Sequence, residues 1–162
     1  SLTASPTYNS SSTLKYNTGA AYDQSNEWPA TNTPQNVTIV NSNLTLKNDR
    51  SLSGMLQIQS GGTFKASDGL KANRTLTIES GGTLDNDGTF SASDGTIVFN
   101  GSGTITGDNT ITLNNLTLNG ALTIPSSTKI NGILQINSGG SVSASPAFDS
   151  SSTLKYKVHF FK

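Results

Sequence analysis

Apolar and polar residues alternate along much of the chain, in short runs that glycine and asparagine interrupt. The clearest runs are the pairs Leu56/Ile58, Leu76/Ile78, Ile111/Leu113, Leu116/Leu118, Leu122/Ile124 and Leu134/Ile136. A period of two places alternate side chains on one face of an extended strand, as in a half-buried β-strand. Because turn residues bound these short runs, the pattern predicts a folded chain that is almost entirely β.

A short motif of strand, Ser-Gly-Gly turn and second strand recurs three times. Residues 56–64 read Leu-Gln-Ile-Gln-Ser-Gly-Gly-Thr-Phe, and related stretches occupy 76–84, which begins 20 residues later, and 134–142. Units of this length bury their apolar faces only against neighbouring units. We therefore predict a parallel β-helix (β-solenoid) with rungs of about 20 residues. A meander of antiparallel hairpins is the alternative; parallel stacking is favoured because it aligns like side chains of successive motifs.

A longer repeat relates the two ends of the sequence. Residues 1–16 return as residues 141–156, an offset of 140 residues, and Ser-Ser-Ser-Thr-Leu-Lys-Tyr is identical in both copies. The offset predicts tandem repeats of about 140 residues, and one continuous solenoid over 1–162. Within it we expect junction rungs with an aromatic insertion in 1–35, regular rungs in 36–140 and the start of the next repeat in 141–162.

The sequence after the second copy departs from the first. Lys-Val-His-Phe-Phe-Lys at 157–162 stands where Asn-Thr-Gly-Ala-Ala-Tyr stands at 17–22. Two interpretations remain open for Lys157–Lys162, a C-terminal cap of the solenoid or a foreign sequence. The chain as a whole is expected to be a segment of a larger array.

Composition narrows the function classes. Serine, threonine, asparagine and glycine make up about half of the 162 residues, 12% are charged, the formal net charge is zero and cysteine is absent. Such a composition alone is compatible with a flexible linker, which the regular alternation argues against. No apolar run reaches the ~20 residues of a membrane span, and no basic patch favours nucleic acid. Disulfides and thiolate metal sites are excluded.

Several segments resemble one known group of proteins. They are residues 11–19, the block Asn26-Glu27-Trp28-Pro29, residues 34–39 and the Leu-x-Ile-x-Ser-Gly-Gly-Thr-Leu rungs. Together they resemble the repetitive β-helical regions of large type IX-secreted bacterial surface proteins, which are similar in design to adhesin stalks. The resemblance covers most of residues 5–142. It implies an extracellular, cell-surface, non-enzymatic role without catalytic residues or cofactors.

Aromatic residues concentrate in the first part of the repeat. They serve either as packing elements of a wider rung or as a surface on which a partner or a sugar ring stacks. Packing is the favoured interpretation. Trp28, with Glu27 and Tyr22, is the first choice for any contact with a partner or surface glycan.

Catalytic and metal-binding motifs are weak. A Ser-His-Asp triad would need His159, the only histidine. The Asp-Asn-Asp-Gly stretch at 85–88 lacks the closing glutamate of a calcium loop, so a solvated turn is favoured. The pairs Asp68/Asp94 and Asp85/Asp87 show no clustered acid–base set. We predict no catalytic, metal or cofactor site.

Threonine pairs at alternate positions suggest one more binding function. Thr-x-Thr occurs at 75/77, 104/106 and 110/112, as in ice-binding solenoids. Related rungs carry Gln57 and Gln135 where Thr77 stands, so the threonine ladder is broken, and ordinary strand threonines are the better interpretation.

The predicted function is therefore structural. We expect a repeat of an extracellular fibre or adhesin stalk that forms a rod, with neighbouring copies of the same repeat as its partners, end to end or laterally. A carbohydrate-active β-helix enzyme and a glycan- or ice-binding module are the alternatives. Unpaired strand edges at the open ends of a solenoid favour end-to-end stacking.

Overall fold

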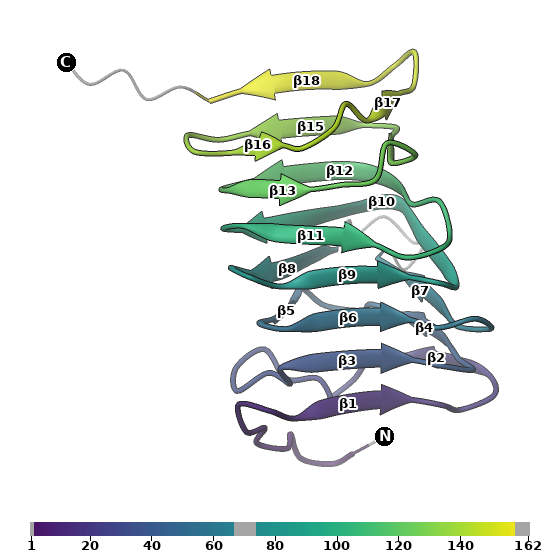
Figure 1. The fold of residues 1–162 in the computed structure, drawn as a ribbon. Helices are drawn as coiled ribbons and strands as arrows, with labels where there is room; N and C mark the ends of the chain where they lie inside the picture. The colour runs from purple at the N-terminus through teal and green to yellow at the C-terminus, as the bar shows by residue number, and fades with distance from the viewer. Residues whose placement is uncertain (1, 67–73, 158–162) are drawn as a thin grey trace.

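The computed structural model describes residues 2–66 and 74–157, without the side chains of residues 92–94. These residues form strands β1 to β18 and contain no helix. The strands stack in a parallel β-solenoid of about seven turns (Figure 1). Every strand pair is parallel, which confirms the predicted β-helix and excludes the antiparallel meander. No segment in the described ranges is a helix long and apolar enough to cross a bilayer.

Each complete turn has three sides, so the strands form three faces. The first face is a seven-stranded sheet of β1 (Thr13–Tyr16), β3 (Asn36–Ile39), β6 (Met55–Ile58), β9 (Thr83–Asn86), β11 (Gly103–Thr106), β13 (Ala121–Thr123) and β16 (Ser141–Val142). The second contains β2 (Ala21–Asp23), β4 (Asn43–Thr45), β7 (Thr63–Lys65), the starts of β10 (Thr89–Asn100) and β12 (Thr112–Leu118), β14 (Lys129–Ile130) and β17 (Ala147–Phe148). The third contains β5 (Arg50–Leu52), β8 (Thr75–Glu79), the ends of β10 and β12, β15 (Ile133–Ile136) and β18 (Thr153–Tyr156).

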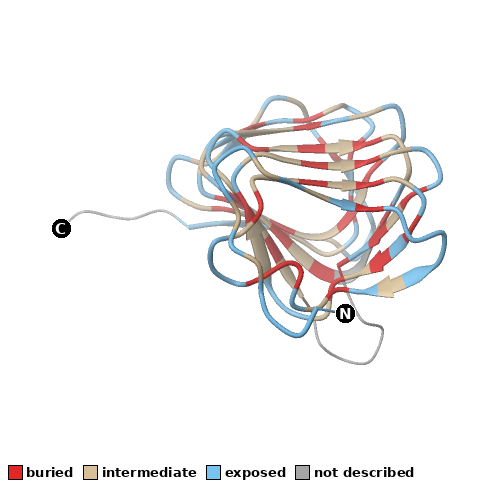
Figure 2. Ribbon diagram, turned by 90° about the horizontal axis from the view of Figure 1, so that it is seen from below, coloured by how far each residue is buried: buried red, intermediate tan, exposed pale blue. Residues whose placement is uncertain are grey.

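Alternation within each strand builds a narrow apolar core along the rod axis. Inward residues of successive turns are register partners and form columns, which are lined by buried positions when the rod is viewed along its axis (Figure 2). The longest column on the third face consists of Leu52, Ile78, Phe99, Leu118, Ile136 and Tyr156. Burying each such side chain contributes about 1.5–3 kcal/mol, so the columns are the main source of cohesion between turns.

The Ser-Gly-Gly turns have one geometry in all three copies. The first glycine adopts a left-handed conformation, with φ of 85° at Gly61, 85° at Gly81 and 84° at Gly139. The second glycine packs against the neighbouring turn. A Cβ atom on Gly82 would lie 2.4 Å from Ile78 Cγ2 and 2.8 Å from the carbonyl oxygen of Gly54. The first glycine is therefore required by its φ angle and the second by close backbone contact.

The three copies of this motif do not all stack on one another. Leu56 on the first face pairs with Leu84, whereas Leu76 on the third face pairs with Ile97. The turn that links β6 to β9 accounts for the difference, because it is longer than the others and displaces the second copy by one side. The rung length was thus predicted correctly, but the alignment of all three motifs above one another was not.

Amide side chains add hydrogen bonds between turns along one edge of the rod. Asn100 Nδ2 donates to Glu79 Oε2 at 2.8 Å, Asn119 Nδ2 to Asn100 Oδ1 at 3.2 Å, and Asn137 Nδ2 to Asn119 Oδ1 at 2.6 Å. The chain of contacts follows four consecutive turns at the corner after the third face. It is an asparagine ladder of the kind that stabilises stacked parallel strands.

Candidate functional site

The first turn contains a cluster of tyrosines around one carboxylate. Glu27, which is 7% exposed, accepts hydrogen bonds from the Tyr16 hydroxyl at 2.9 Å, the Ser25 amide at 2.9 Å and the Tyr22 hydroxyl at 3.4 Å. The Tyr8 hydroxyl donates to the Glu27 backbone oxygen at 2.5 Å. β1 and β2 position Tyr16 and Tyr22, whose ring centroids lie 5.6 Å apart. This arrangement closes the N-terminal turn over the core.

The cluster holds its phenols protonated. Burial raises the pKa of Tyr16 above its ordinary value, and the nearby Glu27 carboxylate raises it further, because a second negative charge is disfavoured there. Burial and Glu27, in that order, also raise the pKa values of Tyr8 and Tyr22. A protonated phenol donates one hydrogen bond and suits a positioning role better than a base.

Trp28 lies at the N-terminal end of the third face and is fully buried. Its Nε1 donates to the Ser51 oxygen at 3.1 Å, and its backbone oxygen accepts from Gln24 Nε2 at 3.2 Å and from Arg50 Nε. Burial lowers the pKa of Arg50, while the neighbouring Tyr16 and Glu27 oppose that shift. Residues 24–35 therefore fold back as a plug, which carries Trp28 into the position of a missing strand.

The structure thus brings together the three residues predicted to contact a partner, Tyr22, Glu27 and Trp28. Their arrangement matches the packing interpretation, since Trp28 has no exposed surface and Glu27 almost none, whereas Tyr22 is half-buried. Contact with a partner or glycan at these residues stays a prediction. Arg50 and Gln24 complete the cluster and were missed, because no sequence signal links residues on successive turns before the register is known.

The C-terminal turn carries the second copy of the same motif without a plug. Phe148, Leu154 and Tyr156 are 45%, 47% and 66% exposed, while Leu2 is the one other strongly exposed large apolar residue among those described. The strands β16, β17 and β18 each pair on one edge only within residues 2–66 and 74–157. This turn is an apolar end surface with open backbone hydrogen-bonding groups. Its sequence signal was the 140-residue offset itself.

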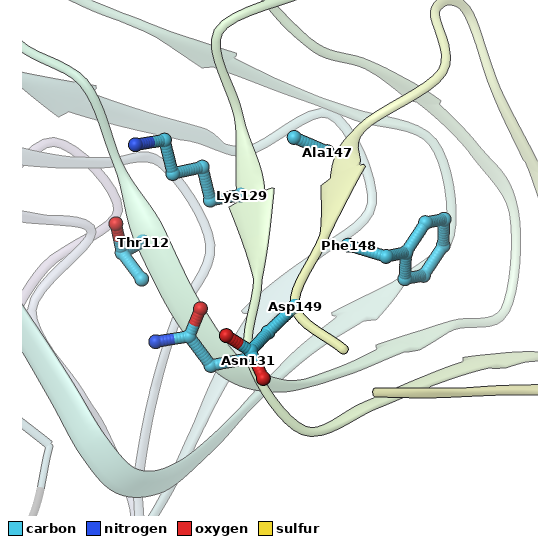
Figure 3. A pocket seen from close by; sticks show the side chains of 6 residues that line it. All are labelled: Thr112, Lys129, Asn131, Ala147, Phe148 and Asp149. Atoms are coloured by element: carbon cyan, nitrogen blue, oxygen red, sulfur yellow. The ribbon is translucent and has the colours of Figure 1, made fainter. Parts of the chain in front are cut away.

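A polar depression of about 410 Å³ lies on the second face near this end. Thr112, Lys129, Asn131, Ala147, Phe148 and Asp149 line it (Figure 3). In the close-up, Ala147 and the Phe148 ring lie to opposite sides of β17, and the Lys129 side chain lies on the Ala147 side. Hydrogen bonds from Ser151 lower the pKa of Asp149, so the depression presents a single carboxylate beside one ammonium group.

The acidic residues considered for calcium or catalysis are held in contacts between turns. Asp85 Oδ2 accepts from Gln57 Nε2 at 3.1 Å, and Asp87 Oδ1 accepts from the Asp108 amide at 3.0 Å. Across the described ranges, no three His, Cys, Asp or Glu side chains gather closely enough to share a metal ion. Asp68, His159 and the side chain of Asp94 lie outside the described part of the chain.

The outward rows of the faces are chemically mixed. On the third face the row reads Ser51, Thr77, Val98, Thr117, Gln135 and Lys155 along successive turns. A regular threonine array does not form there, as the glutamine positions in the sequence predicted.

Comparison with known proteins adds no relative: no family model, no curated protein and no solved structure matches the chain. The fold and the two chemically distinct ends of the rod are therefore the basis on which function is inferred.

Proposed function

We propose that this chain is a rod-forming structural repeat of an extracellular fibre or adhesin stalk. The observation that carries the proposal is the unbroken parallel stack of about seven turns that ends in unpaired strand edges. A stack of this kind grows by adding turns without changing its cross-section, because each turn contacts only its neighbours. The fold is consistent with such a role.

The mechanism is mechanical. Hydrogen bonds between strands run along the rod axis in all three faces, and the apolar columns and the asparagine ladder add cohesion in the same direction. Axial load is thereby shared among many weak bonds instead of one covalent link. Neighbouring copies of the repeat are the proposed partners, because only a matching β-edge satisfies the open backbone groups.

The surface location rests on the resemblance to type IX-secreted surface proteins and on composition. A rod that lacks cysteine, carries no net charge and presents mixed polar rows has few reactive groups, which suits an exposed stalk. We propose no catalytic role, since the acids of the described turns sit singly and the polar depression holds one carboxylate, whereas glycosidases use two at a set separation.

Electron microscopy of concatenated copies tests the proposal. Proteins with one, two and four copies of residues 17–156 placed in tandem are imaged and their lengths compared. We expect straight rods of constant width that lengthen by on the order of 30–35 Å per copy, given strand spacings of ~4.8 Å. Strings of separate globular beads, or compact particles, would overturn the rod. Incubation of the same samples with neutral and acidic polysaccharides should release no new reducing ends.

A further inference from the structure

The two copies of the repeated motif share their local structure but not their surroundings. In both, a backbone turn precedes the strand, with Ser12 N donating to Asn9 O at 3.1 Å and Ser152 N to Asp149 O at 3.0 Å. The identical tetrapeptide Thr-Leu-Lys-Tyr then forms β1 and β18. Tyr16 is 3% exposed, whereas Tyr156 is 66% exposed. The difference therefore arises from what covers each copy.

Residues 17–39 cover the first copy. Glu27 accepts a hydrogen bond from Tyr16 through its carboxylate and from Tyr8 through its backbone oxygen. The exposed residues of the last turn, Phe148 and Tyr156, are the counterparts of these two tyrosines in the repeat. The surface left open at the C-terminal end is thus the surface that the plug occupies at the N-terminal end.

The free strand edge matches as well. β1 pairs with the strand one turn later in the chain, β3, with Thr13 opposite Asn36 and Tyr16 opposite Ile39. β18 pairs with the preceding strand, β15. The open edge of β18 is consequently the edge that β1 uses to bind β3.

We propose that the C-terminal turn docks a segment with the sequence of residues 17–39, supplied by a following copy of the repeat in the same polypeptide. This inference rests on the proposed function. A separate folded copy is a poor donor, because its β3 is already paired with β1 on one edge and β6 on the other. In the docked arrangement, Glu27 of the incoming copy accepts from the Tyr156 hydroxyl and Trp28 of the incoming copy packs near Phe148. Thr153 lies opposite Asn36 of that copy.

Cysteine cross-linking in a two-copy protein tests the register. Residues 1–156 are followed directly by residues 17–162, and Lys155→Cys in the first copy is combined with Thr38→Cys in the second. No native cysteine interferes. The calibration is the single-copy chain with Lys15→Cys and Thr38→Cys, which are register partners in β1 and β3. The matched control replaces Thr45 instead of Thr38 in the second copy, because Thr45 lies on a neighbouring face in β4.

We expect the Lys155/Thr38 pair to oxidise at a rate like that of the calibration pair and at least about tenfold faster than the control pair, because docking raises the effective concentration. Equal rates for the Thr38 and Thr45 pairs would overturn the docking. Tyr156→Phe provides a second measurement: it should lower the unfolding midpoint of the two-copy protein and leave that of the single chain unchanged. An unchanged midpoint in both proteins contradicts the proposed contact with Glu27.

Electron microscopy of the same two-copy protein separates the two proposals. A single straight rod in which the Lys155/Thr38 pair does not close contradicts the docking but keeps the structural function. Two particles joined by a flexible connection contradict both.

Discussion

Tyr16 and Tyr156 occupy the same position in the 140-residue repeat, yet they end core columns on different faces of the solenoid. Tyr16 aligns with Ile39 on the first face, and Tyr156 aligns with Ile136 on the third. Only Tyr16 has a buried carboxylate as its hydrogen-bond partner. Two chemically identical side chains in one molecule therefore form a natural matched pair for mutation.

Removal of the Tyr16 hydroxyl should destabilise the chain. Tyr16→Phe loses a buried hydrogen bond to a carboxylate, so we expect the free energy of unfolding to fall by about 1.5–3 kcal/mol. Tyr156→Phe changes an exposed residue and should alter it by less than about 0.5 kcal/mol. Denaturant unfolding of both variants beside the parent chain measures the difference. Equal effects would mean that Glu27 does not depend on Tyr16.

Stability should decrease in alkaline solution through the same hydroxyl. Below about pH 10 the Tyr16 phenol is protonated in both the folded and the unfolded chain. Above that pH the unfolded chain loses the proton while the folded chain retains it, because burial and Glu27 raise the pKa in the folded state. The contribution of Tyr16 to the free energy of unfolding should then fall by up to about 1.4 kcal/mol per pH unit.

Comparison of the parent chain with Tyr16→Phe isolates this effect from other alkaline titrations. The stability difference between the two proteins should be constant from pH 7 to about 9 and shrink above pH 10. A difference that grows with pH has the wrong sign and would contradict the assignment.

The two glycines of a Ser-Gly-Gly turn should differ in their response to alanine. Gly81→Ala meets no heavy atom within 4 Å but forces a side chain into φ +85°, for which we expect a loss of about 1–2 kcal/mol. Gly82→Ala adds the close contacts with Ile78 and the Gly54 backbone, so its loss should be greater. Thermal unfolding of both variants provides the ranking, and the reverse order would contradict the proposed reason for the second glycine.

One buried hydroxyl offers a route to higher stability. Thr128 is fully buried, and its Oγ1 has no hydrogen-bond partner in the structure. Thr128→Val replaces that hydroxyl with a methyl group of similar shape and should raise the free energy of unfolding by about 1 kcal/mol. Thr123→Val, at an exposed strand position, is the control and should change it little. A destabilised Thr128→Val chain would indicate a hydrogen bond to this hydroxyl.

The fold was predictable because alternation and turn chemistry are local signals. Leu134 and Ile136 point inward as their spacing indicates, and the glycines at 139 and 140 end that strand. The face on which each motif lies was not predictable, since it depends on the residues accumulated in every preceding corner. Leu76 illustrates this, because its motif copies that of Leu56 and lies on another face.

The candidate site was predictable only as a composition of residues. The grouping of Tyr22, Glu27 and Trp28 within a few positions identified the plug, but burial of Trp28 depends on Ser51 and Arg50 from the next turn. Asn86 shows the same limit in the core. It follows inward Ile58 in the first-face column, where alternation favours an apolar residue, and its Nδ2 instead lies 3.4 Å from the carbonyl oxygens of Asn109 and Thr110.

The path from β1 on the first face to β18 on the third amounts to one side less than seven full circuits. In an array, each copy is consequently turned by about a third of a circuit against the one before, and three copies restore the original orientation. With ~4.8 Å per circuit, the axial period of the fibre is on the order of 100 Å. A feature on the flank of one copy, such as the depression beside Lys129, then winds around the fibre as a helix and faces every direction in turn.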